Sequence, residues 1–162
     1  MSRIWPFLIA LSALGCGGAQ FDGHTYRGEG LAFRVGPVPD GWRELQASHA
    51  LLAFRDDADG ATIGVNGRCG QDGDDVPLEA LTHHLFIHFT DRELKSQQTL
   101  ALDGRDALRT EIVAELDGVP KAFTIYVLKK DGCVYDFLYI ADVGRGAPEQ
   151  FDRFVTGFRT LQ

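Results

Sequence analysis

The stretch SQQTLALDGRDALRTEIVAELDGVPKAFTIYVLKKDGCVYDFLYIAD, residues 96–142, decides the fold of this chain. It contains Asp-Gly three times, at residues 103–104, 117–118 and 131–132, and each pair separates two segments with strand character. Asp-Gly is typical of the type I′ turn of a β-hairpin, because both central residues of that turn have positive φ. The stretch therefore predicts four antiparallel strands joined as a meander.

The last two strands of this meander are apolar on both faces. Residues 122–128 and 134–140 carry apolar side chains at almost every position, whereas a sheet with one face in water shows polar residues at every second position. We therefore expect both faces to be covered. The preceding strand differs, because Arg109, Glu111 and Glu115 alternate there with apolar residues. Its wetter face makes Arg109 and Glu111 candidate residues for binding a partner.

The segments on either side of the meander supply further strands and two helices. Short apolar or alternating runs predict strands at residues 31–35, 42–45, 51–55 and 61–69. Apolar residues at helical spacing predict one helix over residues 77–90 and another that begins at Pro148. The residues that form these two stripes are Leu78, Leu81, Leu85, Phe89, Phe151, Phe154, Val155 and Phe158. Because each helix can cover one face of the sheet, we expect an α+β fold, an α/β/α sandwich with a central antiparallel sheet.

The N-terminal residues have the pattern of an export signal. Arg3 precedes a short apolar run, and Ala13-Leu14-Gly15-Cys16 resembles the lipobox of bacterial lipoproteins. The run is too short to span a bilayer permanently. We therefore expect residues 1–15 to be removed, Cys16 to be lipidated, and residues 16–30 to form a flexible tether. No aspartate follows Cys16, which favours the outer membrane. The alternative is an ordinary secretory signal cut near residues 15–19, with Cys16 incidental.

The charge of the chain limits its partners. The net charge is −7, and binding of nucleic acid requires a basic face that neutralises phosphates. The sequence therefore argues against a nucleic-acid partner. The same acidity argues against docking of the folded body on anionic lipid. We expect contact with the membrane only through the N-terminal lipid.

Cys69 and Cys133 are the two cysteines that remain. In an oxidising compartment a disulfide between them is the simplest interpretation. A metal site and a cysteine nucleophile are alternatives, although no Cys-x-x-Cys motif occurs.

Two further groups are candidates for binding. His84 and His88 stand four apart on the predicted first helix, a spacing that can hold a metal ion; the alternative is that both hydrogen-bond to loops or face water. Asp72, Asp74 and Asp75 form an acidic loop before that helix, which we interpret as a solvated helix entry or a surface that binds a partner; a weak calcium site is the alternative. No serine lies in a nucleophile elbow. We expect no enzyme activity and no cofactor.

Four segments together resemble the Mog1/PsbP-like superfamily, including its small bacterial lipoproteins. They are Pro39-Asp40-Gly41-Trp42, Pro77-Leu78-Glu79-Ala80-Leu81, Leu102-Asp103-Gly104-Arg105-Asp106-Ala107, and the helix that ends at Phe158. The resemblance implies a single domain over residues 31–162 and a mostly non-enzymatic role in binding or assembling proteins. Our leading hypothesis is a lipid-anchored envelope protein that binds a protein partner or acts as a scaffold. The alternative is a lipoprotein that binds a small ligand or a metal.

Overall fold

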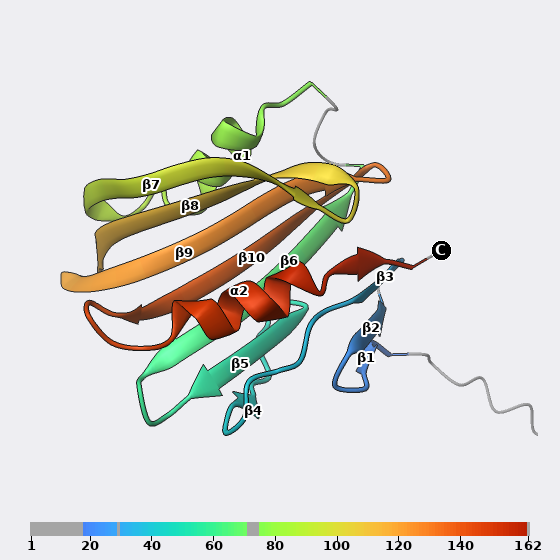
Figure 1. Cartoon of the computed structure of the whole chain (residues 1–162), viewed down its shortest axis with the longest axis horizontal. Coiled ribbons are helices and arrows are strands. Elements are labelled where there is room, and N and C mark those ends of the chain that lie inside the picture. Colours follow the sequence, from blue (N-terminus) through green and yellow to red (C-terminus); the bar gives the residue numbers. More distant parts are fainter. Residues whose placement is uncertain (1–17, 29, 71–74, 162) are drawn as a thin grey trace, which may run out of the picture.

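The chain folds around a seven-stranded antiparallel sheet, with one helix on each side of it (Figure 1). The computed structural model describes residues 18–28, 30–70 and 75–161. Cys16, Asp72 and Asp74 lie outside the described residues. The strand order is β4-β5-β6-β10-β9-β8-β7, and neighbouring strands pair antiparallel. Their bounds are β4 Arg43–Glu44, β5 Leu52–Asp56, β6 Ala61–Cys69, β7 Thr90–Leu102, β8 Arg105–Leu116, β9 Val119–Lys130 and β10 Cys133–Asp142.

The predicted meander is confirmed. Strands β7 to β10 follow one another across the sheet, and each Asp-Gly pair forms the turn between two of them. Asp103 and Gly104 have φ values of 49° and 74°, and the pairs at residues 117–118 and 131–132 also have positive φ throughout. Aspartate and glycine tolerate this left-handed region better than other residues do, which is why these turns are legible in the sequence.

A second sheet of four short strands is present that the sequence did not predict. It contains β1 Gln20–Phe21, β2 Thr25–Gly28, β3 Leu31–Arg34 and β11 Arg159–Thr160, in the order β1-β2-β3-β11. The predicted tether over residues 16–30 is therefore wrong from Gln20 onward. Phe33 of β3 contacts Tyr135 of β10 edge to face, with their ring centroids 6.0 Å apart, so this small sheet is packed on the large one.

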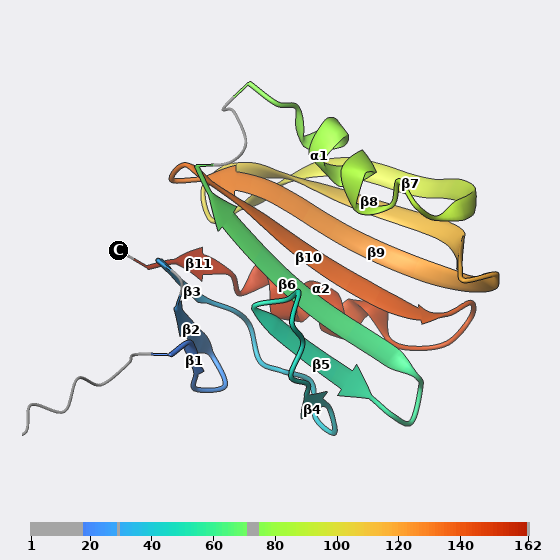
Figure 2. The same cartoon turned by 180° about the vertical axis from the view of Figure 1, so that it is seen from behind.

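Two separate hydrophobic cores lie on the two faces of the large sheet. One face packs against α2, Pro148–Thr156, and against the small sheet. Phe151, Phe154 and Phe158 are completely buried in this larger core. The other face packs against α1, Leu78–Leu85, through Leu81 and the neighbouring partly buried residues. Figure 2 shows α1 in front of the sheet and α2 behind it. Both faces of β9 and β10 are thus covered, as the alternation predicted.

The first helix is shorter than the predicted helix over residues 77–90. It ends at Leu85, and Phe86 caps it with a non-helical backbone conformation. Phe89 nevertheless packs on the α1 side, where its ring stacks on that of Phe123 at 4.7 Å. Phe89 therefore belongs to the predicted apolar surface on this side and is partly buried, but it lies beyond the helix. Within residues 18–28, 30–70 and 75–161, neither helix has the length and apolar character needed to cross a bilayer.

Candidate functional site

The disulfide marks the end of the sheet where a pocket opens. Cys69 of β6 and Cys133 of β10 are bonded, and they lie directly opposite each other in the strand register. The bond joins two neighbouring strands just before the chain leaves β6 toward α1. Beside it, the amide of Gly70 donates to the carbonyl of Gly132 over 3.1 Å. This end of the sheet is therefore fixed by both covalent and backbone contacts.

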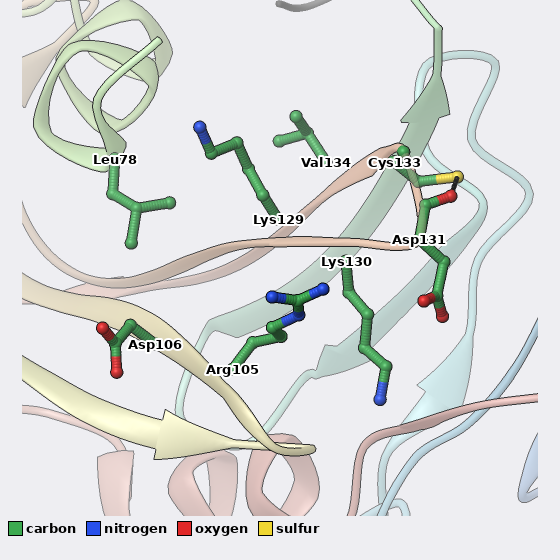
Figure 3. Close-up of a pocket in the computed structure, with 9 residues that line it drawn as sticks. Leu78, Arg105, Asp106, Lys129, Lys130, Asp131, Cys133 and Val134 are labelled. Carbon is green, nitrogen blue, oxygen red and sulfur yellow. Dashed lines mark hydrogen bonds between the residues drawn. The ribbon is translucent and has the colours of Figure 1, made fainter. Parts of the chain in front are cut away.

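The pocket has a volume of about 490 Å³ and draws its lining from three parts of the chain. The β9–β10 turn and adjoining residues form one wall, the start of β8 forms another, and Leu78 of α1 forms the third. We call this hollow the sheet-end pocket (Figure 3). Its lining residues are Leu78, Arg105, Asp106, Lys129, Lys130, Asp131, Gly132, Cys133 and Val134.

Charged side chains surround the sheet-end pocket, but only some of them are available to a ligand. Lys129 donates to the carbonyl of Val76 over 2.7 Å and so ties β9 to the segment before α1. Lys130 points the opposite way in Figure 3 and pairs with Asp103 at 2.6 Å. Arg105 and Asp106 are exposed and form no ion pair with another described residue. These two are the charged groups that the pocket offers most directly.

Asp103 holds the turn between β7 and β8 to two other segments. Its carboxylate accepts hydrogen bonds from Lys130 and from the amide and hydroxyl of Thr160. Burial alone would raise the pKa of Asp103, but these hydrogen bonds outweigh it and hold the pKa below its ordinary value. Asp103 therefore serves the fold and is not a candidate acid or base.

Arg109 and Glu111 do not form the exposed binding surface that the alternation suggested. Arg109 is only 9% exposed and lies under α2. Its guanidinium pairs with Glu111 at 2.7 Å and with Asp152 at 3.2 Å, and its Nε also donates to the hydroxyl of Tyr126. Glu111 accepts a further hydrogen bond from Ser96. These groups form an internal network that fastens α2 to strands β7, β8 and β9.

The electrostatics of this network agree with a structural role. Burial alone would lower the pKa of Arg109, but the hydrogen bonds to Asp152 and Glu111 raise it above its ordinary value. The hydrogen bond from Ser96 lowers the pKa of Glu111, and Arg109 reinforces that effect. Burial raises the pKa of Tyr126, with a further contribution from Asp152. All three groups are therefore held in their ordinary charge states at neutral pH.

The two histidines predicted as a metal pair are not on one helix. His84 lies in the last turn of α1, whereas His88 lies beyond its end at Leu85, so the expected i to i+4 spacing on a helix is absent. Both side chains are exposed. In the described part of the chain, no group of three or more His, Cys, Asp or Glu side chains is placed to hold a metal ion. Asp75, the described member of the acidic loop, is exposed three residues before α1.

Sequence reasoning missed Arg105, Asp106 and Lys129 as members of a site. The sequence does indicate that these residues lie close together, because the Asp-Gly turns place the start of β8 and the end of β9 at the same end of an antiparallel meander. Residues just after the first Asp-Gly pair and just before the third must therefore meet. The described lining residues bring no free thiol, serine or histidine together with a base, since Cys133 is oxidised. The pocket offers contacts of mixed charge around the apolar side chains of Leu78 and Val134.

Comparison with known proteins identifies the fold. No protein-family profile matches the sequence, and no characterised protein is detectably similar to it in sequence. Among solved structures, the cyanobacterial PsbP protein CyanoP from Synechocystis has a TM-score of 0.55 and 14% identity, covering 95% of this chain and 99% of its own. LpqN, involved in cell envelope biogenesis of Mycobacterium tuberculosis, has a TM-score of 0.54 and 17% identity, covering 83% and 87%.

A protein from Bacteroides thetaiotaomicron has a TM-score of 0.55 and 10% identity over 80% of this chain. The present chain spans only 45% of that protein. At these identities the comparisons establish the architecture. The fold that the resemblance implied is thus confirmed: like the PsbP protein CyanoP, the chain has a mostly antiparallel sheet with two short helices.

Proposed function

We propose that this chain with a Mog1/PsbP-like fold is a non-catalytic module of the bacterial envelope, anchored by a lipid on Cys16, that binds a protein partner. The observation that carries the proposal is the sheet-end pocket. Arg105, Asp106 and Lys129 line it together with the half-buried side chain of Leu78 and the largely buried side chain of Val134. An apolar centre with a polar rim is the usual composition of a protein interface.

Three further observations support the proposal. The Cys69–Cys133 disulfide is typical of a protein that folds in an oxidising compartment. The groups with shifted pKa values in the Arg109 network and at Asp103 are engaged in holding elements together, and a catalytic site instead places such groups in a cleft. LpqN, which shares the fold, is involved in cell envelope biogenesis, and we extend an envelope role to this chain.

Site-specific photo-cross-linking in intact envelopes tests the partner surface. A photo-reactive residue replaces Asp106 in the pocket or, as a control, Asp59 in the β5–β6 turn at the other end of β6. We expect a discrete protein adduct from position 106, absent from position 59 and lost when Arg105→Glu is added. No adduct from position 106, or the same adducts from both positions, would contradict the proposed partner surface.

A small ligand is the second candidate for the same pocket. Its volume of about 490 Å³ lies within the usual range of small-molecule sites, roughly 300–1,000 Å³. Native mass spectrometry of protein isolated from its envelope separates the two candidates. A retained small molecule that is lost on Arg105→Glu favours the ligand, whereas a protein adduct without a retained molecule favours the partner.

A further inference from the structure

The outer face of the small sheet carries three arginines. Tyr26 and Phe33 point into the core, so strand alternation places Arg27 and Arg34 on the outer face. Arg159 of β11 pairs directly opposite Arg34, and residues directly opposite in an antiparallel pair lie on the same face. The three arginines are all exposed. We call this surface the arginine face.

Like charges lie opposite each other on the arginine face, and the described carboxylates nearby offset them only in part. Like charges directly opposite each other destabilise a sheet, and Arg34 and Arg159 occupy such a pair. Arg27 and Arg34 form no ion pair with another described residue. The carboxylate nearest to the Nε atom of Arg159 is that of Asp103 at 3.8 Å, and it already binds Lys130 and Thr160. This surface is therefore suited to an anion from outside the protein.

The carboxylate at the neighbouring turn is also engaged. Asp22, between β1 and β2, accepts hydrogen bonds from the amides of His24 and Thr25 at 2.9 and 2.7 Å. These backbone bonds, that of Thr25 first, hold the pKa of Asp22 below its ordinary value, and Arg27 adds a smaller coulombic contribution, so the ionised Asp22 offsets part of the charge of Arg27. Three arginines outnumber Asp22 and the carboxylate of Asp103 that Arg159 shares with Lys130, so the arginine face keeps an excess of positive charge in a chain whose net charge is −7. The charge of this protein is segregated and not uniformly acidic.

The position of the arginine face relative to Cys16 indicates which anion it meets. Gln20 pairs with Arg27 and so lies on the same face, and it follows Cys16 by only four residues. Four residues of fully extended chain reach at most about 14 Å. Figures 1 and 2 place β1 at the far end of the molecule from α1. A lipid on Cys16 would therefore hold the arginine face close to the membrane surface.

We propose that the arginine face docks on the anionic phospholipid headgroups of the membrane that holds the anchor. The inference rests on the proposed lipid anchor at Cys16. Guanidinium groups bind phosphate oxygens in pairs of parallel hydrogen bonds, and they remain charged at all physiological pH values. Docking in this orientation directs the small sheet toward the bilayer and α1 away from it. It also replaces the expectation, drawn from net charge, that the folded body does not contact anionic lipid.

Fluorescence quenching in reconstituted vesicles tests the docking. The lipidated full-length protein carries a fluorophore at Thr25→Cys, opposite Arg34, or at Glu79→Cys on α1 as a reference. The vesicles contain a headgroup-attached quencher and either phosphatidylglycerol with phosphatidylethanolamine or phosphatidylcholine alone. We expect stronger quenching at position 25 than at position 79, in the anionic vesicles only. Salt at 1 M should remove this excess, because the Debye length then falls to about 3 Å.

Charge-reversal variants identify the residues responsible. Arg34→Glu with Arg159→Glu should abolish the excess quenching, and Arg34→Glu alone should reduce it, whereas the single substitution Arg145→Glu at an exposed arginine in the β10–α2 loop should preserve it. Arg34→Gln with Arg159→Gln provides a milder pair if the reversed charges disturb folding, which thermal melting monitors. Equal quenching at both positions, or an excess that survives either double substitution in a folded protein, would overturn the proposal.

Flotation of the same vesicles separates failure of the docking from failure of the anchor. Protein that floats but shows equal quenching at positions 25 and 79 has an anchor and no docking. Protein that does not float with either kind of vesicle lacks the lipid anchor, and both proposals then fail. Floating protein with the predicted excess supports both.

Discussion

The two faces of the large sheet are covered in different ways. The α2 face has a large aromatic core, the small sheet and the Arg109 network, and Phe151, Phe154 and Phe158 are completely buried there. The α1 face has a smaller core, and its helix has eight residues. The hydroxyl of Thr82 on that helix is buried and has no hydrogen-bond partner among the residues that the structure describes. The difference indicates that the α2 face supplies most of the stability, while the α1 face is the less firmly held.

The largest effect should come from the disulfide, because β6 and β10 belong to both faces. Closing a loop over a separation of 64 residues stabilises a fold by about 4.3 kcal/mol in the chain-entropy model. Cys69→Ser and Cys133→Ser should each lower the free energy of unfolding by similar amounts in urea denaturation. Reductant should lower the melting temperature of the wild type and leave the double variant unchanged. Unequal losses, or a free thiol titrated in the wild type, would count against the bond.

Truncation of one core side chain on each face tests whether the α2 face supplies more stability than the α1 face. Phe154→Ala on α2 should cost about 3–4 kcal/mol and Leu81→Ala on α1 about 2 kcal/mol, because a larger side chain leaves the larger cavity. Hydrogen exchange provides the sharper readout. Phe154→Ala should accelerate exchange throughout the sheet, and Leu81→Ala mainly in α1 and its contacts. Global acceleration by both variants would mean that the two faces are equally important.

Buried polar groups should respond with opposite signs on the two faces. Asp152→Asn weakens the charged hydrogen bonds to Arg109 and should cost about 1–2 kcal/mol, since Asp152 is partly exposed. Thr82→Val removes an unpaired buried hydroxyl and should stabilise the protein by up to about 1 kcal/mol. Urea denaturation of the two variants measures both changes. A loss of stability in Thr82→Val would show that this hydroxyl has a partner in solution.

Acid should weaken the α2 face first. The pKa values of Glu111 and Asp103 are lower in the folded protein than their ordinary values of about 4.3 and 3.9. Groups with lowered pKa values stabilise the fold above their unfolded pKa, and this stabilisation is lost as the pH falls through the folded pKa. Stability should therefore decline below about pH 4. Glu111→Gln should reduce the decline seen by fluorescence of Trp42, which packs on the α2-side core; an unchanged decline would exclude Glu111 as a contributor.

The smallest effect concerns the arginine face. Arg34→Gln relieves the repulsion with Arg159 and should raise stability by about 0.2–1 kcal/mol. Arg145→Gln, in an exposed loop, should change it by less. Thermal melting at low salt measures both, and 1 M salt should remove the gain by screening. A destabilised Arg34→Gln variant would show that Arg34 has a favourable partner within the fold.

The parts of the fold that could be predicted from the sequence are those that depend on local sequence signals. Asp-Gly turns fix the meander through the φ values of two adjacent residues, and β6 was predicted with its observed bounds. The small sheet was missed because two of its strands have only two residues, and β11 pairs with β3 across the length of the chain. No local pattern records a pairing of that kind.

The candidate sites were also hard to predict wherever they depend on contacts between residues that are distant in the sequence. Arg109 alternates with apolar residues as a solvent-facing residue does, but Asp152, 43 residues away, approaches from α2 and covers it. The predicted helix over residues 77–90 extends beyond the end of α1. Phe89 fits the apolar stripe of that helix, but the backbone has already left the helical conformation at Phe86. The disulfide was predictable because two cysteines leave few alternatives. The sheet-end pocket was not, because it requires three segments to meet.

Intact mass spectrometry of the protein purified from its native envelope tests the central claim, an anchored envelope module, most directly. We expect a mass without residues 1–15 and with acyl chains on Cys16. A mass that corresponds to the uncut chain from Met1, with an unmodified Cys16, would contradict it.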